Sequence, residues 1–243
     1  MLKELIEITT ALRIERYSQS KALFLAGSIV RGEGTSTSDL DLVVVFDRIS
    51  AAYRDSYIYK NWPVEAFVHD PQTLEYFFRH VDRPSGVPSL PRMVSEGVEI
   101  PGASSFTNEL KQLAHTVLEE GPPTWSSADI DRSRYAITDL IDDLRDPRSV
   151  QEAYAISTAL YPALTDHYFR SRQLWSAKGK AIPRRLSAVA PEMAEKFAIG
   201  FEPLLSEGCA EKVIGLAEEI LEPRGGYLFE GYKLEAPELW RVT

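Results

Sequence analysis

The residue types best suited to chemistry gather between positions 23 and 46, LFLAGSIVRGEGTSTSDLDLVVVF. An apolar run ends there in Gly27-Ser28, and after a loop of small polar residues Asp39 and Asp41 open a valine-rich run. Side chains at positions i and i+2 of a strand project from one face, with Cα atoms about 6.5–7 Å apart. Two carboxylates so close repel each other, and a divalent cation supplies the counter-charge. Because magnesium prefers carboxylate, water and phosphate oxygens, the pair predicts a Mg²⁺ site.

Gly27-Ser28 predicts a phosphate-binding turn beside this pair of aspartates. A glycine at a strand end lets the backbone approach a ligand closely, and a serine hydroxyl can donate to a phosphate oxygen. Free N–H groups at the start of a following helix also favour anions. A phosphate cradle next to a metal-binding carboxylate pair is what phosphoryl or nucleotidyl transfer requires.

Glu65 is the natural candidate for a third carboxylate, because it lies within a predicted strand at 64–69, VEAFVH. If this strand lies beside the strand at 40–46, Glu65 reaches the same site. It would then either complete the metal shell or act as general base toward an acceptor hydroxyl. The plainer alternatives are a solvent-facing Glu65 and aspartates that form a turn.

The elements that position these residues predict an α/β (α+β) fold class. Strands are expected at 22–26, 40–46, 64–69 and 97–100, and helices at 1–19, 71–80 and 104–119. The proline-rich stretch 82–91 is expected to be a loop. Gly121-Pro122-Pro123 predicts the boundary between a small mixed-sheet domain over 1–120 and an all-helical bundle domain over 121–243.

The composition is that of a soluble globular protein, with 44% hydrophobic and 26% charged residues among 243. No apolar run approaches the roughly 20 residues that span a bilayer, so no membrane partner is expected. The single cysteine, Cys209, excludes an intramolecular disulfide and fits a cytoplasmic location. The net charge of −9 argues against binding of long nucleic acid, because such binding needs a basic surface.

Taken together, Gly27-Ser28, Asp39, Asp41 and Glu65 resemble the signature of the nucleotidyltransferase superfamily that includes polymerase β. That signature is a Gly-Ser, a spacer of about ten residues, an Asp-x-Asp and a third acidic residue on a later strand, and the resemblance covers residues 22–69. It implies Asp39, Asp41 and Glu65 as catalytic and Mg²⁺-binding residues. It also implies that Gly27 and Ser28 hold the β and γ phosphates of a nucleoside triphosphate.

The size of the chain and its helical C-terminal half resemble the aminoglycoside nucleotidyltransferases and their uncharacterised bacterial relatives. Arg172, Trp175, Gly179-Lys180 and Pro183-Arg184 are similar to a run whose basic residues contact ATP phosphates in some of those enzymes, with arginine at 184 where they have lysine. The likeness implies that Arg172, Lys180 and Arg184 bind the nucleotide and that ATP is the donor.

The expected function is transfer of a nucleoside monophosphate, AMP from ATP, to a hydroxyl of a small acceptor held between the domains. The evenly acidic chain favours a cationic acceptor. Asp139 and Asp143 share a face of a predicted helix at 127–145 and are candidates for its pocket, the alternative being a solvated face. Two other functions stay open: an antitoxin-like enzyme that modifies a protein, and a non-catalytic module that binds or senses nucleotides.

Overall fold

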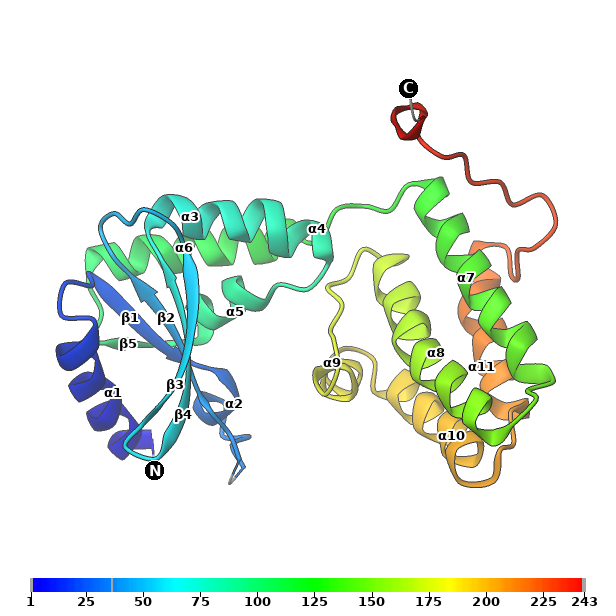
Figure 1. The fold of residues 1–243 in the computed structure, drawn as a ribbon, viewed down its shortest axis with the longest axis horizontal. Helices are drawn as coiled ribbons and strands as arrows, with labels where there is room; N and C mark the ends of the chain where they lie inside the picture. The colour runs from blue at the N-terminus through cyan, green and yellow to red at the C-terminus, as the bar shows by residue number, and fades with distance from the viewer. Residues whose placement is uncertain (1, 36, 242–243) are drawn as a thin grey trace. The chain divides into compact units, whose positions relative to one another are not determined.

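The computed structural model describes residues 2–35 and 37–241, which divide between Pro122 and Pro123 into two compact units (Figure 1). The N-terminal unit is built on a five-stranded mixed sheet, and the C-terminal unit is helical. Each unit buries its own apolar side chains. The predicted α+β class, a small mixed sheet followed by helices, is confirmed.

The sheet has the strand order β3-β4-β2-β1-β5. The central strands β2 and β4 run parallel, and every other neighbouring pair is antiparallel. The bounds are β1 (Ala22–Ala26), β2 (Leu40–Val45), β3 (Tyr53–Tyr59), β4 (Trp62–His69) and β5 (Val98–Ile100).

Helices cover both faces of this sheet because its central strands are apolar on both sides. Along β2, Leu42 and Val44 pack in the cluster that includes α1, whereas Val43 and Val45 pack on the opposite face with α3, α5 and α6. The bounds of the helices are α1 (Leu2–Arg16), α2 (Gly27–Val30), α3 (Pro71–Tyr76), the π-helix η1 (Phe77–Asp82), α4 (Arg83–Ser85), α5 (Ser89–Glu96) and α6 (Ser105–Glu120).

The strand β3 was not predicted from the sequence. This strand is at the edge of the sheet, and its residues alternate between exposed and half-buried, so it lacks the apolar run that marked the other strands. Lys60 and Asn61 connect it to β4 with φ values of 47° and 68°. A tight type I′ hairpin turn requires positive φ at both of its central residues, and asparagine tolerates positive φ well.

The expectation of a loop over 82–91 was wrong for most of that segment. Residues 83–85 continue the helical path as α4, and α5 begins at Ser89. Gly86, with φ of 76°, ends the first helix, and the Asp82 carboxylate accepts the Leu90 N–H at 2.7 Å. The Asp82 side chain thus supplies a hydrogen-bond acceptor for the N-terminus of α5, which the prolines of this segment cannot supply.

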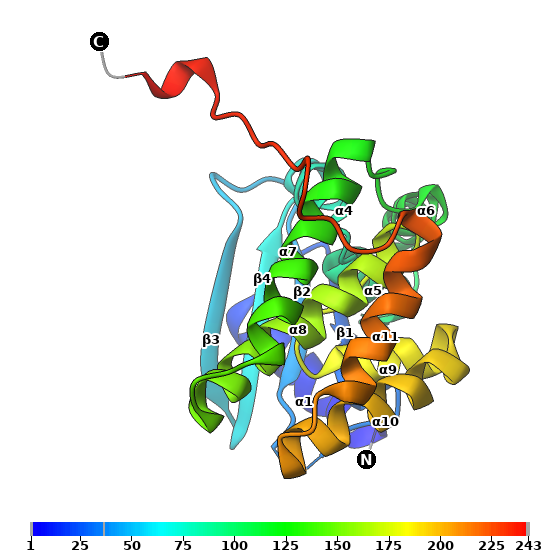
Figure 2. The same cartoon turned by 90° about the vertical axis from the view of Figure 1, so that its right-hand side faces the viewer.

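The C-terminal unit is a helical bundle in which α7, α8, α10 and α11 pack against one another (Figure 2). Its core includes Leu160, Leu164, Phe169 and Phe197, all nearly inaccessible to solvent. The elements are α7 (Ser127–Arg145), α8 (Val150–Arg170), α9 (Ala181–Val189), α10 (Pro191–Glu207), α11 (Glu211–Leu221), and the 3₁₀ turns η2 (Glu222–Arg224) and η3 (Glu238–Trp240).

Across the described ranges 2–35 and 37–241, none of the helices combines the length and the apolar character that a membrane crossing needs.

Asp70 anchors the connection between β4 and α3 and provides a test of the fold. Its buried carboxylate accepts N–H bonds from Thr73 at 2.8 Å and Ile49 at 3.2 Å. Burial raises the pKa of Asp70, but the hydrogen bonds from Thr73 and Ile49 outweigh burial and lower that pKa overall.

We therefore expect Asp70→Ala to lower the free energy of unfolding at pH 7 by about 1–3 kcal/mol. Because the folded-state pKa is depressed, this contribution exists above the unfolded-state pKa of about 3.9 and disappears as pH falls through the folded-state value. Urea unfolding between pH 7 and pH 3 measures it. Asp70→Asn, which keeps the acceptor without the charge, should lose less and show little pH dependence. An Asp70→Ala deficit independent of pH would contradict this account.

Candidate active site

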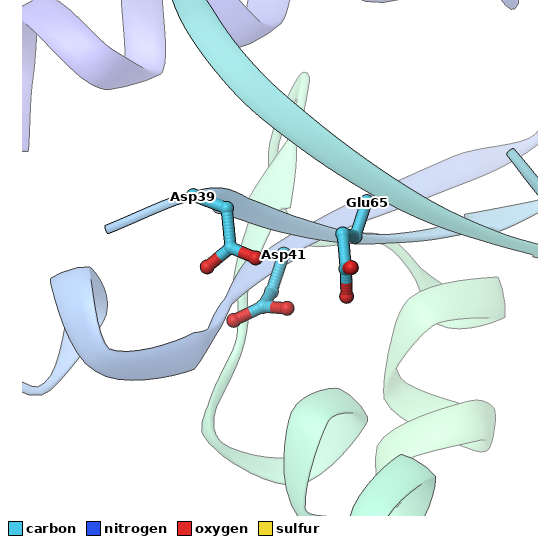
Figure 3. Close-up of side chains that lie close together, drawn as sticks. All are labelled: Asp39, Asp41 and Glu65. Atoms are coloured by element: carbon cyan, nitrogen blue, oxygen red, sulfur yellow. The ribbon is translucent and has the colours of Figure 1, made fainter. Parts of the chain in front are cut away.

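The register of the sheet brings the three predicted carboxylates together. In the parallel pairing of β2 with β4, Asp41 lies directly opposite Glu65, and Asp39 precedes Asp41 by two residues. The condition set for Glu65, that its strand lies beside the strand predicted at 40–46, is thus met. Figure 3 shows the three carboxylates extending from the two strands toward the same side of the sheet.

The carboxylate groups of Asp39, Asp41 and Glu65 offer one oxygen each, and these three oxygens lie within 4.8 Å of one another. All three residues are half-buried, so the cluster is open to a ligand while its backbone is held in the sheet. In an octahedral Mg²⁺ site with Mg–O bonds of about 2.1 Å, neighbouring oxygens lie about 3.0 Å apart and opposite oxygens about 4.2 Å apart. Rotation of the half-buried side chains can bring the three oxygens to such distances, so the donor set fits a hard divalent cation.

Gly27 borders the cluster from the end of β1. Its neighbour Ala26 pairs with Asp41 in the antiparallel β1–β2 ladder, and Gly27 itself has φ of 81°. A Cβ atom at Gly27 would lie only 2.0 Å from Oδ2 of Asp41. The position therefore requires glycine for two reasons: its φ is positive, and a Cβ atom would overlap the Asp41 carboxylate.

Ser28 is held by the loop that leads from α2 to β2. Its Oγ lies 3.3 Å from Oγ of Ser38, which in turn accepts the Thr35 N–H at 2.8 Å. The Glu33 N–H donates to the Ser28 carbonyl at 2.9 Å. These bonds connect the Gly-Ser turn to Ser38, the residue directly before Asp39. The described part of the loop therefore keeps the Ser28 hydroxyl close to the carboxylate cluster.

Arg54 also lies next to the carboxylate cluster and was not predicted from the sequence. It lies on β3 and forms an ion pair with Glu65, while its guanidinium carbon lies 5.2 Å from the centre of the Phe67 ring. In the β3–β4 register Arg54 is opposite Phe67, so Glu65 is its diagonal neighbour. Recognition of the edge strand and its Lys60-Asn61 turn would have predicted this contact.

His69 lies on the same face of β4 as Glu65 but belongs to the core. It is 2% exposed and packs edge-on against Phe77 with ring centroids 4.9 Å apart. Burial lowers the pKa of His69 to about 4, against the smaller opposing effect of the Asp70 charge. The imidazole is therefore neutral at pH 7 and takes no part in the carboxylate cluster.

The other predicted nucleotide contacts belong to the C-terminal unit, whereas the carboxylates belong to the N-terminal one. Arg172 follows the end of α8, Lys180 immediately precedes α9, and Arg184 lies within α9; all three are exposed. Their role stays a prediction. Asp139 and Asp143 are also exposed, as the solvated-face alternative expected.

A mixed sheet that presents three convergent carboxylates next to a Gly-Ser turn is compatible with metal-assisted group transfer. Residues 7–75 match the model of the family described as nucleotidyltransferase domain. The N-terminal unit is therefore a nucleotidyltransferase domain of the polymerase-β type, and the protein is a nucleotidyltransferase. The narrower likeness to the aminoglycoside enzymes stays a prediction.

Among solved structures, the chain is similar to a nucleotidyltransferase-like protein from Exiguobacterium sibiricum. The two are 16% identical with a TM-score of 0.45, over 90% of this chain and 75% of that one. No curated protein matches the sequence.

Substitution of Gly27 tests how closely the turn and the carboxylates are fitted. We expect Gly27→Ala to weaken Mn²⁺ binding at least tenfold, because the added methyl must displace the Asp41 carboxylate. Gly32→Ala is the matched control: Gly32 also has positive φ, 74°, but a Cβ there meets nothing within 4 Å. Titration of Mn²⁺ by calorimetry distinguishes the two, and equal losses in both variants would show that backbone strain alone matters.

Proposed function

We propose that this protein transfers AMP from ATP to a hydroxyl of a small, cationic acceptor, with Mg²⁺ held by Asp39, Asp41 and Glu65. The acceptor oxygen bonds to the α phosphorus of ATP as the bond to the β phosphate breaks, and pyrophosphate leaves. The observation that carries the proposal is the approach of three carboxylate oxygens to within 4.8 Å beside the Gly-Ser turn of a nucleotidyltransferase domain. Three acidic groups so placed repel one another unless a cation or a proton joins them.

Each group of the site has a distinct task in this reaction. Bound Mg²⁺ would neutralise phosphate charge and favour the ionised form of the attacking hydroxyl. Asp39 and Asp41 hold the ion, while Gly27 and Ser28 hold the β and γ phosphates through backbone approach and the serine hydroxyl. Glu65 either completes the metal shell or takes the proton of the acceptor hydroxyl.

The C-terminal unit supplies the remaining nucleotide contacts in this proposal. Arg172, Lys180 and Arg184 are exposed cations, suited to phosphate oxygens. The net charge of −9 favours a cationic acceptor over long nucleic acid, and a cytoplasmic location supplies ATP and Mg²⁺.

The acceptor is identified by incubation of the protein with labelled ATP, Mg²⁺ and a panel of hydroxylated amines. A mass increase of one AMP on a member of the panel, absent when EDTA is added, supports the proposal. Label that appears on protein instead would favour a protein-modifying enzyme. Binding of ATP without any transfer product, indifferent to metal, would favour a nucleotide sensor.

We expect Asp39→Asn and Asp41→Asn to abolish measurable transfer and to weaken Mn²⁺ binding, with thermal unfolding little changed, because both side chains are half-buried at a strand start. Asp47→Asn, at an exposed position after β2, is the matched control. Loss of folding in either site variant, or full activity, would contradict the assigned role.

Glu65→Gln is expected to slow transfer by about 10²–10⁴-fold, the range of a lost general base. Mn²⁺ titration then separates its two possible tasks. Weakened Mn²⁺ binding assigns Glu65 to the metal shell, and unchanged Mn²⁺ binding with slow transfer assigns it as the base. Unchanged turnover would remove Glu65 from the site.

Arg54→Gln tests the ion pair with Glu65. Because the Arg54 guanidinium competes with a cation for this carboxylate, its removal should tighten Mn²⁺ binding by up to about fivefold, as expected for an exposed pair worth at most about 1 kcal/mol. Arg48→Gln, an exposed arginine whose guanidinium bonds Gln72 at 2.9 Å, controls for net charge. Weaker Mn²⁺ binding in Arg54→Gln alone would mean that Arg54 orients Glu65 instead.

A further inference from the structure

The C-terminal unit contains a cavity that the proposed reaction does not explain. It has a volume of about 210 Å³, several times the roughly 30 Å³ share of one water molecule in the liquid. It lies where α8 ends, beside the segment that precedes α7 and the turn η2. The lining comprises Thr124, Trp125, Ile130, Arg170, Ser171, Arg172, Gln173 and Arg224.

Three guanidinium groups line this cavity. Arg170 is 5% exposed and lies against Trp125, with its guanidinium carbon 5.4 Å from the ring centre, whereas Arg172 and Arg224 are exposed. In the described part of the chain the hydrogen bonds of all three go to neutral oxygens: Arg170 to the Pro123 carbonyl, Arg172 to the Tyr168 carbonyl and the Ser171 hydroxyl, and Arg224 to the Ser171 carbonyl.

Capping of α8 accounts for only part of this arrangement. Cations are favourable at a helix C-terminus, and the bonds from Arg172 and Arg224 to carbonyls fit that role. A guanidinium has five N–H donors, however, and those bonds use a single terminal nitrogen on each of the three residues. The Nε of Arg170 is buried and has no hydrogen-bond partner. The guanidinium donors that these bonds leave over on Arg172 and Arg224, which are exposed, can serve a ligand that supplies acceptors.

Two acidic residues offset part of the positive charge around the cavity. Burial lowers the pKa of Arg170, and the acidic residues that oppose this effect are Asp166 and Asp129. Asp129 is already engaged, since it accepts bonds from Ser126 at 2.7 Å and Arg132 at 3.3 Å.

His167, on the same turn of α8 as Arg170, responds to the same positive charge. Its pKa is lowered to about 4, first by burial and then by the charges of Arg172, Arg134 and Arg224. The charges of two of the three cavity arginines thus help to keep a neighbouring imidazole neutral, so a positive potential persists at this end of α8.

We propose that this cavity is a phosphate-type oxyanion site, in which Arg170 forms the floor, Arg172 and Arg224 form the rim, and Trp125 forms the wall. Guanidinium groups bind phosphate oxygens in forked, charge-assisted pairs, and three of them suit a dianion or a diphosphate group. The site needs no divalent cation, because its own cations balance the ligand. It shares Arg172 with the nucleotide contacts proposed above but rests on the cavity alone, not on the transfer reaction.

Calorimetric titration of the full-length protein with inorganic pyrophosphate, in EDTA, tests the site. We expect binding that weakens with added salt, and that weakens at least about fivefold in Arg224→Gln and in Arg172→Gln, since each removes a charged donor. Arg148→Gln removes an exposed arginine of the same unit outside the cavity and should bind as the unaltered protein does. No binding of pyrophosphate in EDTA, or an equal loss in Arg148→Gln, would overturn the proposal.

Two further measurements locate the ligand and its source. Arg170→Met removes the buried floor and should abolish binding; if it fails to fold, the Arg224→Gln result decides. Asp39→Asn should retain pyrophosphate binding in EDTA, so failure of the acidic site and failure of this cavity are distinguishable, and loss of binding in Asp39→Asn would count against the cavity. Titration with ATP in EDTA identifies the source of the anion. If ATP binds more tightly than pyrophosphate, the ligand is a nucleotide; if the two affinities are equal, the ligand is the free anion.

Discussion

The site depends on holding three carboxylates close together against their mutual repulsion. Two unit charges 4.8 Å apart repel by roughly 3 kcal/mol at an effective dielectric constant of about 20, and by less where water screens them. Opposing this, Val43, Val44 and Val45 of the same strand are fully buried, and each such side chain contributes about 1.5–3 kcal/mol. Burial of these valines opposes the repulsion at the start of the strand, and the negative charge of the cluster is available to attract a cation.

Strand pairing in the sheet fixes the positions of these groups. Parallel pairing of β2 with β4 places Asp41 and Glu65 side by side. Antiparallel pairing of β1 with β2 places Gly27 next to Asp41. Arg54 approaches from the outer strand β3 and neutralises part of the negative charge. The carboxylate cluster thus belongs to the N-terminal unit, and the arginine-lined cavity at the end of α8 belongs to the C-terminal unit.

The errors of prediction have a common physical origin. The edge strand β3 has one covered face and polar alternate residues, so its hydrophobic signal was weak, and with it Arg54 was overlooked. Segment 82–91 contains prolines and glycine, which usually indicate a loop, but the Asp82 carboxylate supplies the cap that lets α5 begin. Both features depend on contacts between residues that local patterns do not relate.

The sequence by itself determined the apolar strands, the succession of an α/β half and a helical half, and the residues of the acidic cluster, because residue type and two-residue periodicity carry that information locally. Tertiary structure alone decided which strands are neighbours and in what register, and so placed Glu65 opposite Asp41. It likewise decided that Arg170, Arg172 and Arg224 meet around Trp125. Register and helix packing arise from the burial of whole faces, and no local spacing contains them.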